Sequence, residues 1–105
     1  MNSGDPIDVQ FTDAMRDIYR KAVQACNYRP IRFLQMVEEL GGVATAKRLL
    51  AGSVQEGFAT LWQCGRLDLS VEALVLQPQW QRLFTQAELA EARQRLQGAG
   101  YTTIQ

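Results

Sequence analysis

Residues 57–76 read GFATLWQCGRLDLSVEALVL, and this stretch decides the fold. Its first half has the apolar spacing of a helix that carries Phe58 and Trp62 and ends at Gly65. Its second half, residues 69–76, is apolar on almost every side, which is typical of the central helix of a bundle. The two valines of this half would also suit a strand. We predict a helix, because no partner strand is evident elsewhere in the chain.

Three further helices are expected before this stretch. The first begins near Thr12, because apolar residues then recur at every third or fourth position as far as Cys26. The second has Pro30 in its first turn and ends at the glycine pair of residues 41–42, which can supply a left-handed cap. The third is short and ends at Gly52.

Capping residues mark the other helix starts. Ser53 and Glu56 have the spacing of a capping box, which predicts that the fourth helix begins at this point. Thr85 and Glu88 form a second such box, and the helix that follows is expected to end near residue 97. Asp68 is placed to cap the apolar segment that follows it.

These elements predict an all-α fold, a compact single-domain bundle of five or six short helices. Residues 1–10 are expected to be a flexible lead-in, residues 11–101 the helical domain and residues 102–105 a C-terminal tail. A composition of 47% hydrophobic and 21% charged residues is that of an ordinary globular domain. The predicted core contains Ile18, Leu34, Val37, Leu49, Leu50, Phe58, Leu61, Trp62, Leu74 and Leu89.

Composition also excludes several classes of function. Lysine plus arginine and aspartate plus glutamate both number 11, so the formal charge is zero, which argues against a dedicated nucleic-acid or membrane-surface binder. The chain has no histidine, which excludes histidine-based triads and histidine-ligated zinc. We therefore expect no catalytic residue, no metal, no cofactor and no small-molecule substrate.

The expected location is the cytoplasm. The first six residues are polar and no signal peptide follows them, and no apolar run approaches the roughly 18 residues that cross a bilayer. Cys26 and Cys64 lack metal-ligand spacing, and we expect both to be reduced thiols buried as small apolar side chains.

Four residues are candidate partner contacts: Trp80, Arg29, Arg32 and Arg66. Trp80 stands between two glutamines in a polar loop after Pro78, where an exposed aromatic could anchor a partner. Arg29 and Arg32 belong to a basic excess in residues 16–32. This excess is either a patch for an acidic partner or, as we favour, a solvated face whose charges are half paired locally.

The corner before the apolar segment has a structural interpretation. Arg66 could fork onto the last carbonyls of the preceding helix or onto Glu72, while Asp68 acts as a cap. Asp68 and Glu72 are four residues apart and superficially resemble an acid/base pair, but such pairs come from opposed surfaces. The helix-turn-helix pattern around residues 54–64 is likewise not interpreted as a DNA-binding motif, because this segment has no lysine or arginine to contact DNA.

From about Phe11 to Tyr101 the chain resembles a family of small, all-helical bacterial proteins of unknown function. The resemblance is carried by residues 33–37, 41–50, 57–76 and 83–85, above all by the GFxxLWxxGRLDLSVEALVL pattern. It implies a compact helical domain that occurs alone or within larger chains. It implies no activity, substrate or catalytic residue.

The sequence therefore predicts a non-catalytic helical interaction or accessory module in a bacterial system. A nucleic-acid-associated accessory domain is the alternative, and a small-ligand-binding or enzymatic domain is a third. The partner is expected to be another protein or a second copy of the chain, because zero net charge removes long-range repulsion between copies. For a homodimer, the contact is expected at Trp80 and the Pro78 loop or on the last helix.

Overall fold

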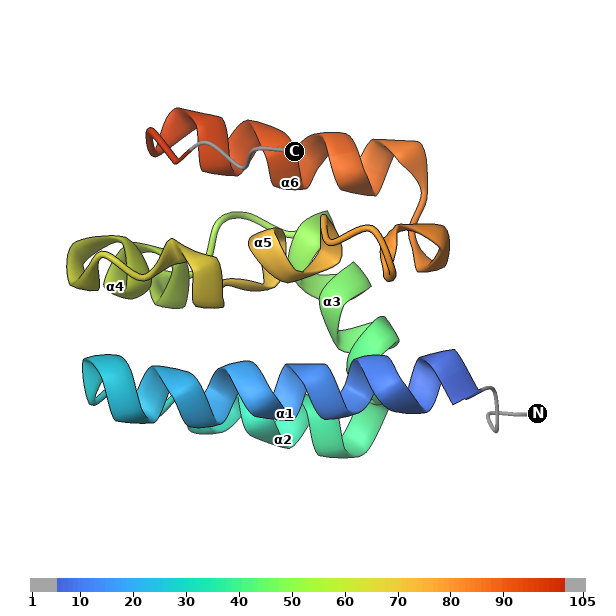
Figure 1. Ribbon diagram of the computed structural model, residues 1–105, viewed down its shortest axis with the longest axis horizontal. Coiled ribbons are helices and arrows are strands. Elements are labelled where there is room, and N and C mark those ends of the chain that lie inside the picture. The colour runs from blue at the N-terminus through green and yellow to red at the C-terminus, as the bar shows by residue number, and fades with distance from the viewer. Residues whose placement is uncertain (1–5, 102–105) are drawn as a thin grey trace.

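Helices account for all the regular structure of residues 6–101. The computed structural model describes residues 6–101, and no strand occurs among them. The helices are α1 (Pro6–Cys26), α2 (Ile31–Leu40), α3 (Gly42–Ala51), α4 (Glu56–Cys64), η1 (Leu67–Leu69), α5 (Val71–Val75), η2 (Gln81–Leu83) and α6 (Gln86–Gly98), where η marks a 3₁₀ helix (Figure 1). The predicted all-α single-domain bundle is confirmed.

The helices form three layers (Figure 1). Helices α1 and α2 run antiparallel in one outer layer and α6 forms the other, while α4 and α5 lie between them. Helix α3 crosses from the α1–α2 layer into the middle one. The radius of gyration is 12.9 Å, about the value expected for a compact domain of ~100 residues.

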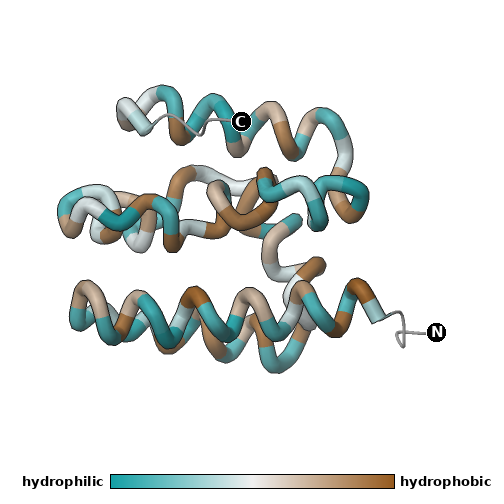
Figure 2. Tube along the Cα trace, in the orientation of Figure 1, coloured by the Kyte–Doolittle hydropathy of each residue, from teal (hydrophilic) through white to brown (hydrophobic). Residues whose placement is uncertain are grey.

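The apolar segment predicted as a helix over residues 69–76 is central, as predicted, but its α-helix covers only Val71–Val75. All five residues of α5 are buried, and they lie at the centre of the hydropathy view (Figure 2). Its cap differs from the prediction, because the hydroxyl of Ser70 rather than Asp68 accepts the backbone N–H of Ala73, at 3.1 Å. Ser70 has the extended backbone that a cap requires, and its side chain is buried against the helix that it starts.

Helix α1 starts earlier than predicted. It begins at Pro6 rather than near Thr12, so the lead-in expected over residues 1–10 is helical from residue 6 onward, and residues 1–5 lie outside the described part. The reason is Phe11, which is fully buried and packs edge-on against Trp80 and Phe84 with both ring centroids 5.4 Å away. These long-range contacts hold the first turns of the helix. The tail expected at residues 102–105 also lies outside the described residues.

The other helix ends follow the sequence with one exception. Asn27 ends α1 with a φ of 52°, and Gly41 ends α2 with a φ of 86°. The capping box of Thr85 and Glu88 is present. The box predicted for residues 53–56 is wrong, because α4 begins only at Glu56 and has no side-chain cap.

Most of the predicted core is buried. Ile18, Val37, Leu50, Leu61, Leu74 and Leu89 are buried, while Leu34, Leu49 and Phe58 are half-buried. Trp62 contradicts the prediction, since 55% of its surface is exposed.

Helices α1 and α3 approach closely at Gly42. The Gly42 N–H donates a hydrogen bond of 2.9 Å to Oγ1 of Thr12, whose own hydroxyl donates to the carbonyl of Asp8 at 3.0 Å. A Cβ at residue 42 would lie 2.7 Å from Cα of Thr12. Only glycine fits this contact, which sets the angle at which α3 leaves the α1–α2 layer.

Candidate interaction groove

A groove of about 560 Å³ opens between the α1–α2 layer and the middle layer of α4 and α5. It is closed on one side by α5 and open to solvent on the other. Its apolar lining includes Ile18, Phe33, Met36, Phe58, Leu61 and Val71. We call this feature the groove throughout.

The groove exists because α2 has more apolar side chains than its neighbours can cover. Val37 is the only residue of α2 that is buried. Helix α2 is ten residues long and packs mainly on α1 and α3, and the residues of its first turn, Ile31, Arg32 and Phe33, line the groove. Ile31 consequently stands 52% exposed at the edge of the groove.

Two unpaired charges stand on opposite walls of the groove. Arg32 extends from α2 and Glu56 from the first turn of α4, and both are exposed. Neither makes an ion pair with any other residue of the described range 6–101. The rim therefore has one cation facing one anion across an apolar floor.

Tyr28 closes one end of the groove. Its hydroxyl lies so close to α4 that a Cβ at Gly57 would be 2.6 Å from it. Burial, together with the charge of Glu56, raises the pKa of the Tyr28 phenol, so it stays protonated near neutral pH. The hydroxyl is thus available as a hydrogen-bond donor beside the anionic wall.

The buried carboxylate of Glu72 lies at the floor of the groove and is neutralised by Arg95. Nη1 of Arg95 lies 2.9 Å from Oε2 of Glu72, and the two side chains are only 4% and 8% exposed. The remaining donors of the guanidinium bind Glu91 and three carbonyls at the end of α3, those of Leu49, Leu50 and Gly52. Five hydrogen bonds use all five N–H groups of the guanidinium, so this cluster has a structural role, and the Glu72 carboxylate is bound by Arg95 rather than directed at a substrate.

Arg66 and Asp68 pair with each other. Nε and Nη2 of Arg66 donate to the two oxygens of Asp68 at 2.9 and 3.0 Å, and these bonds lower the pKa of the Asp68 carboxyl. The predicted fork of Arg66 onto helix carbonyls or Glu72 is therefore wrong. Asp68 and Glu72 are bound by different arginines, so they do not form an acid/base pair.

The two tryptophans exchange their predicted places. Trp80, the predicted surface contact, is 8% exposed and packs on Phe11 in the core, with its Nε1 buried and without a hydrogen-bond partner among the described residues. The loop turns inward because Gln81 Nε2 donates to the carbonyl of Leu76 at 2.7 Å. Trp62 is the exposed one, and it borders a second, shallower hollow of about 270 Å³.

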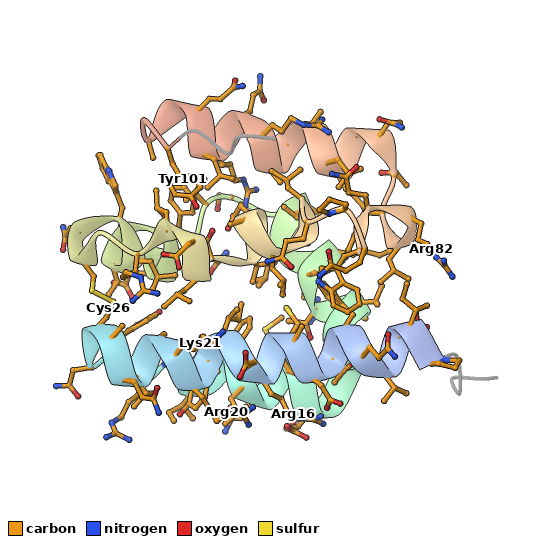
Figure 3. The ribbon with its side chains drawn as sticks, in the orientation of Figure 1. Arg16, Arg20, Lys21, Cys26, Arg82 and Tyr101 are labelled. Carbon is orange, nitrogen blue, oxygen red and sulfur yellow. A yellow bond between two sulfur atoms is a disulfide. The ribbon has the colours of Figure 1, made fainter. Side chains whose placement is uncertain are left out.

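Cys26 and Cys64 form a disulfide, with Cα atoms 5.9 Å apart. The bond joins the last residue of α1 to the last residue of α4 (Figure 3). The prediction of two reduced, buried thiols is therefore wrong. The sequence places each cysteine at a helix end, but only the packing of α1 against α4 brings the two together.

Three of the five cations in the basic excess at residues 16–32 are ion-paired, in line with the partly paired, solvated face that we favoured. Its ion pairs are Arg16–Asp13, Arg16–Glu38, Arg20–Asp17 and Lys21–Asp17, and Figure 3 shows Arg16 and Arg20 on the outer side of the α1–α2 layer. Arg29 and Arg32 are exposed and make no ion pair within residues 6–101. Of these two candidate contacts, only Arg32 lines the groove.

The sequence pattern does not mark the apolar residues of the groove as a site. Phe33 and Phe58 lie on regular helical stripes, which predict core positions as readily as an open surface. The one available signal was α2 itself, where six apolar residues in ten exceed what one face of a short helix can bury.

Residues 6–101 contain no group of three or more histidine, cysteine, aspartate or glutamate side chains that could hold a metal ion. None of the helices in this range is long and apolar enough to cross a membrane. No known protein family, curated protein or solved structure matches the chain.

Proposed function

We propose that this chain is a non-catalytic helical interaction module, and that the groove receives apolar side chains of a protein partner. The observation that carries the proposal is the exposed Ile31 at the edge of a half-open apolar groove. Contiguous apolar surface that is rimmed by polar groups commonly marks a protein-binding site. The rim here has Arg32, Glu56 and the Tyr28 hydroxyl, which can fix the orientation of what binds.

The ionisable groups support binding rather than chemistry. An acid or base that acts on a substrate must have a free proton or lone pair directed at it. Glu72 is instead paired with an arginine whose donors are all in use. The phenol of Tyr28, with its raised pKa, is a poor base near neutral pH.

Nucleic acid is the less favoured partner. Helix α4, which would be the recognition helix, contains no lysine or arginine, and its Leu61 is buried in the bundle. Arg29 and Arg32 are the unpaired cations nearest the groove, and two phosphate contacts supply little affinity. Salt-dependent retention on DNA or RNA that Arg29→Glu with Arg32→Glu abolishes would favour this alternative.

Site-specific photo-crosslinking in the native host tests the proposal. A photoreactive amino acid replaces Ile31 in one strain, and in the control strain it replaces Arg93, an exposed residue of α6 outside the groove. We expect a light-dependent protein adduct from position 31 and none of the same mass from position 93. Failure to form any protein adduct from position 31 contradicts the proposal, and a nucleic-acid adduct supports the alternative.

A further inference from the structure

We infer that the partner in the groove is a second copy of this chain, related to the first by a two-fold axis that passes through the groove. The inference rests on the proposed function, because it names the partner of the same surface. It is carried by the arrangement of charge around the groove.

The rim is complementary to itself. In a two-fold interface each residue i that contacts residue j is matched by a second contact of j with i. Arg32 and Glu56 stand on opposite walls, both exposed and both without an ion pair among the described residues. An axis between the walls places Arg32 of one copy opposite Glu56 of the other, and forms this ion pair twice.

The apolar surface fits the same axis. Ile31 precedes Arg32 on α2 and is half exposed, so a copy that brings Arg32 to the far wall also brings Ile31 to the mouth of the opposite groove. Each copy then covers Ile31 of the other copy, a side chain that is exposed to water in the monomer. The zero net charge of the chain adds no long-range repulsion to this approach.

The contact predicted from the sequence lies elsewhere and has less support. Trp80 is in the core and offers nothing to a partner. The larger apolar side chains of α6, Leu89 and Leu96, are buried together with Ala92, and only the small Ala87 and Ala90 are exposed. The groove is thus a better place for a dimer contact than the Pro78 loop or the last helix.

Sedimentation equilibrium with charge-reversal variants tests the inference. The variants are Arg32→Glu, Glu56→Lys and the double variant, measured with the wild type over about a hundredfold range of concentration. Both positions are exposed and unpaired in a single copy, so circular dichroism should show unchanged helix content. Arg93→Glu on α6 is the matched control, because it reverses an exposed arginine outside the groove.

We expect the wild type and the control to dimerise alike. Each single reversal creates two like-charge contacts per dimer and should weaken association by about tenfold or more. The double variant exchanges the two charges and should restore association to within a few-fold of the wild type.

Three outcomes would overturn the inference: a monomer at every concentration, a dimer indifferent to both single reversals, or single defects that the double variant does not repair. They leave the proposed function separately testable. A monomeric protein that still forms an adduct of another mass from position 31 retains the interaction module and loses only the second copy as partner.

Discussion

Arg95 on α6 and Glu72 on α5 form a buried ion pair, with Nη1 and Oε2 2.9 Å apart. The same guanidinium binds the carbonyls of Leu49, Leu50 and Gly52, which the end of α3 leaves without helical partners. The Arg95 side chain thus joins α3, α5 and α6, and it donates hydrogen bonds to the free carbonyls at the end of α3. Its contribution to stability comes from what its loss would leave unpaired.

Replacing Arg95 with leucine should therefore destabilise the fold strongly. The change leaves a buried carboxylate and several buried carbonyls without donors, and breaking one side of such a pair costs about 3–5 kcal/mol. Arg95→Lys should cost less but still be destabilising, since three donors on one nitrogen cannot reproduce the fork. Urea unfolding measures both free energies.

A double-mutant cycle provides the control for this prediction. Glu72→Gln removes the charge that Arg95 compensates, so Glu72→Gln with Arg95→Leu should cost less than the two single changes added together. A loss below about 1 kcal/mol for Arg95→Leu, the cost of an ordinary surface change, would contradict the structural role of the pair.

Gly42 and Gly98 should respond oppositely to alanine. At residue 42 the new methyl group would meet the backbone of Thr12, and overpacking of this kind costs about 1–3 kcal/mol. At Gly98, at the end of α6, no atom lies within 4 Å of the added Cβ, so the higher helix propensity of alanine should leave stability unchanged or raise it by several tenths of a kcal/mol. Thermal unfolding of the two variants checks the contrast. Equal effects would show that α1 and α3 do not meet as described.

Stability should fall in acid, partly through Glu88. Burial raises the pKa of Glu88, but hydrogen bonds from Lys47 and from the Thr85 N–H lower it further, so the folded-state pKa is depressed. A depressed pKa contributes stability above the unfolded-state pKa of a glutamate, about 4.3, and that contribution is lost as the pH falls through the lower folded value.

Glu88→Gln isolates this effect. Glutamine can keep the capping box with Thr85 but cannot titrate, so the variant should be less stable than wild type at neutral pH and lose less stability below pH ~4.3. Urea unfolding at a series of pH values gives both curves. Parallel curves would show that Glu88 contributes nothing to the acid sensitivity.

Reduction of the disulfide should destabilise the protein without changing its fold. Cys26 and Cys64 are 38 residues apart, and a loop of this length is expected to contribute about 4 kcal/mol through the entropy of the unfolded chain. We expect a thiol-free phosphine reductant to lower the melting temperature of the wild type. The double variant Cys26→Ser with Cys64→Ser should melt at the temperature of the reduced wild type, and the reductant should not change its melting temperature. Identical melting with and without reductant would contradict the disulfide.

The sequence predicts features whose causes are local. The box of Thr85 and Glu88 and the ion pairs within α1 depend on residues three or four apart, and the structure contains them. Ser53 and Glu56 have the same spacing but form no box. Arg95 binds the carbonyl of Gly52 at 2.6 Å, and both Gly52 and Gln55 have extended backbone. The first residue of α4 is therefore Glu56, two residues later than a Ser53 cap would place it.

The groove could not be predicted for a related reason. An apolar stripe says that a helix has a face to bury, but the partner that covers it is set by packing between distant segments. Phe33 and Phe58 sit on such stripes and line the groove. Cys26 and Cys64 pair only because α1 and α4 end side by side.

One tryptophan is exposed and the other is buried, so the fluorescence of each reports on a different part of the protein. Trp62 is in water and should emit at long wavelength and be quenched by iodide, whereas Trp80, enclosed with Phe11, should emit at shorter wavelength and resist quenching. A Trp62→Phe protein would therefore report the opening of the core alone. In the wild type, the quenchable fraction of the emission would follow events at the surface of α4 while the protein remains folded.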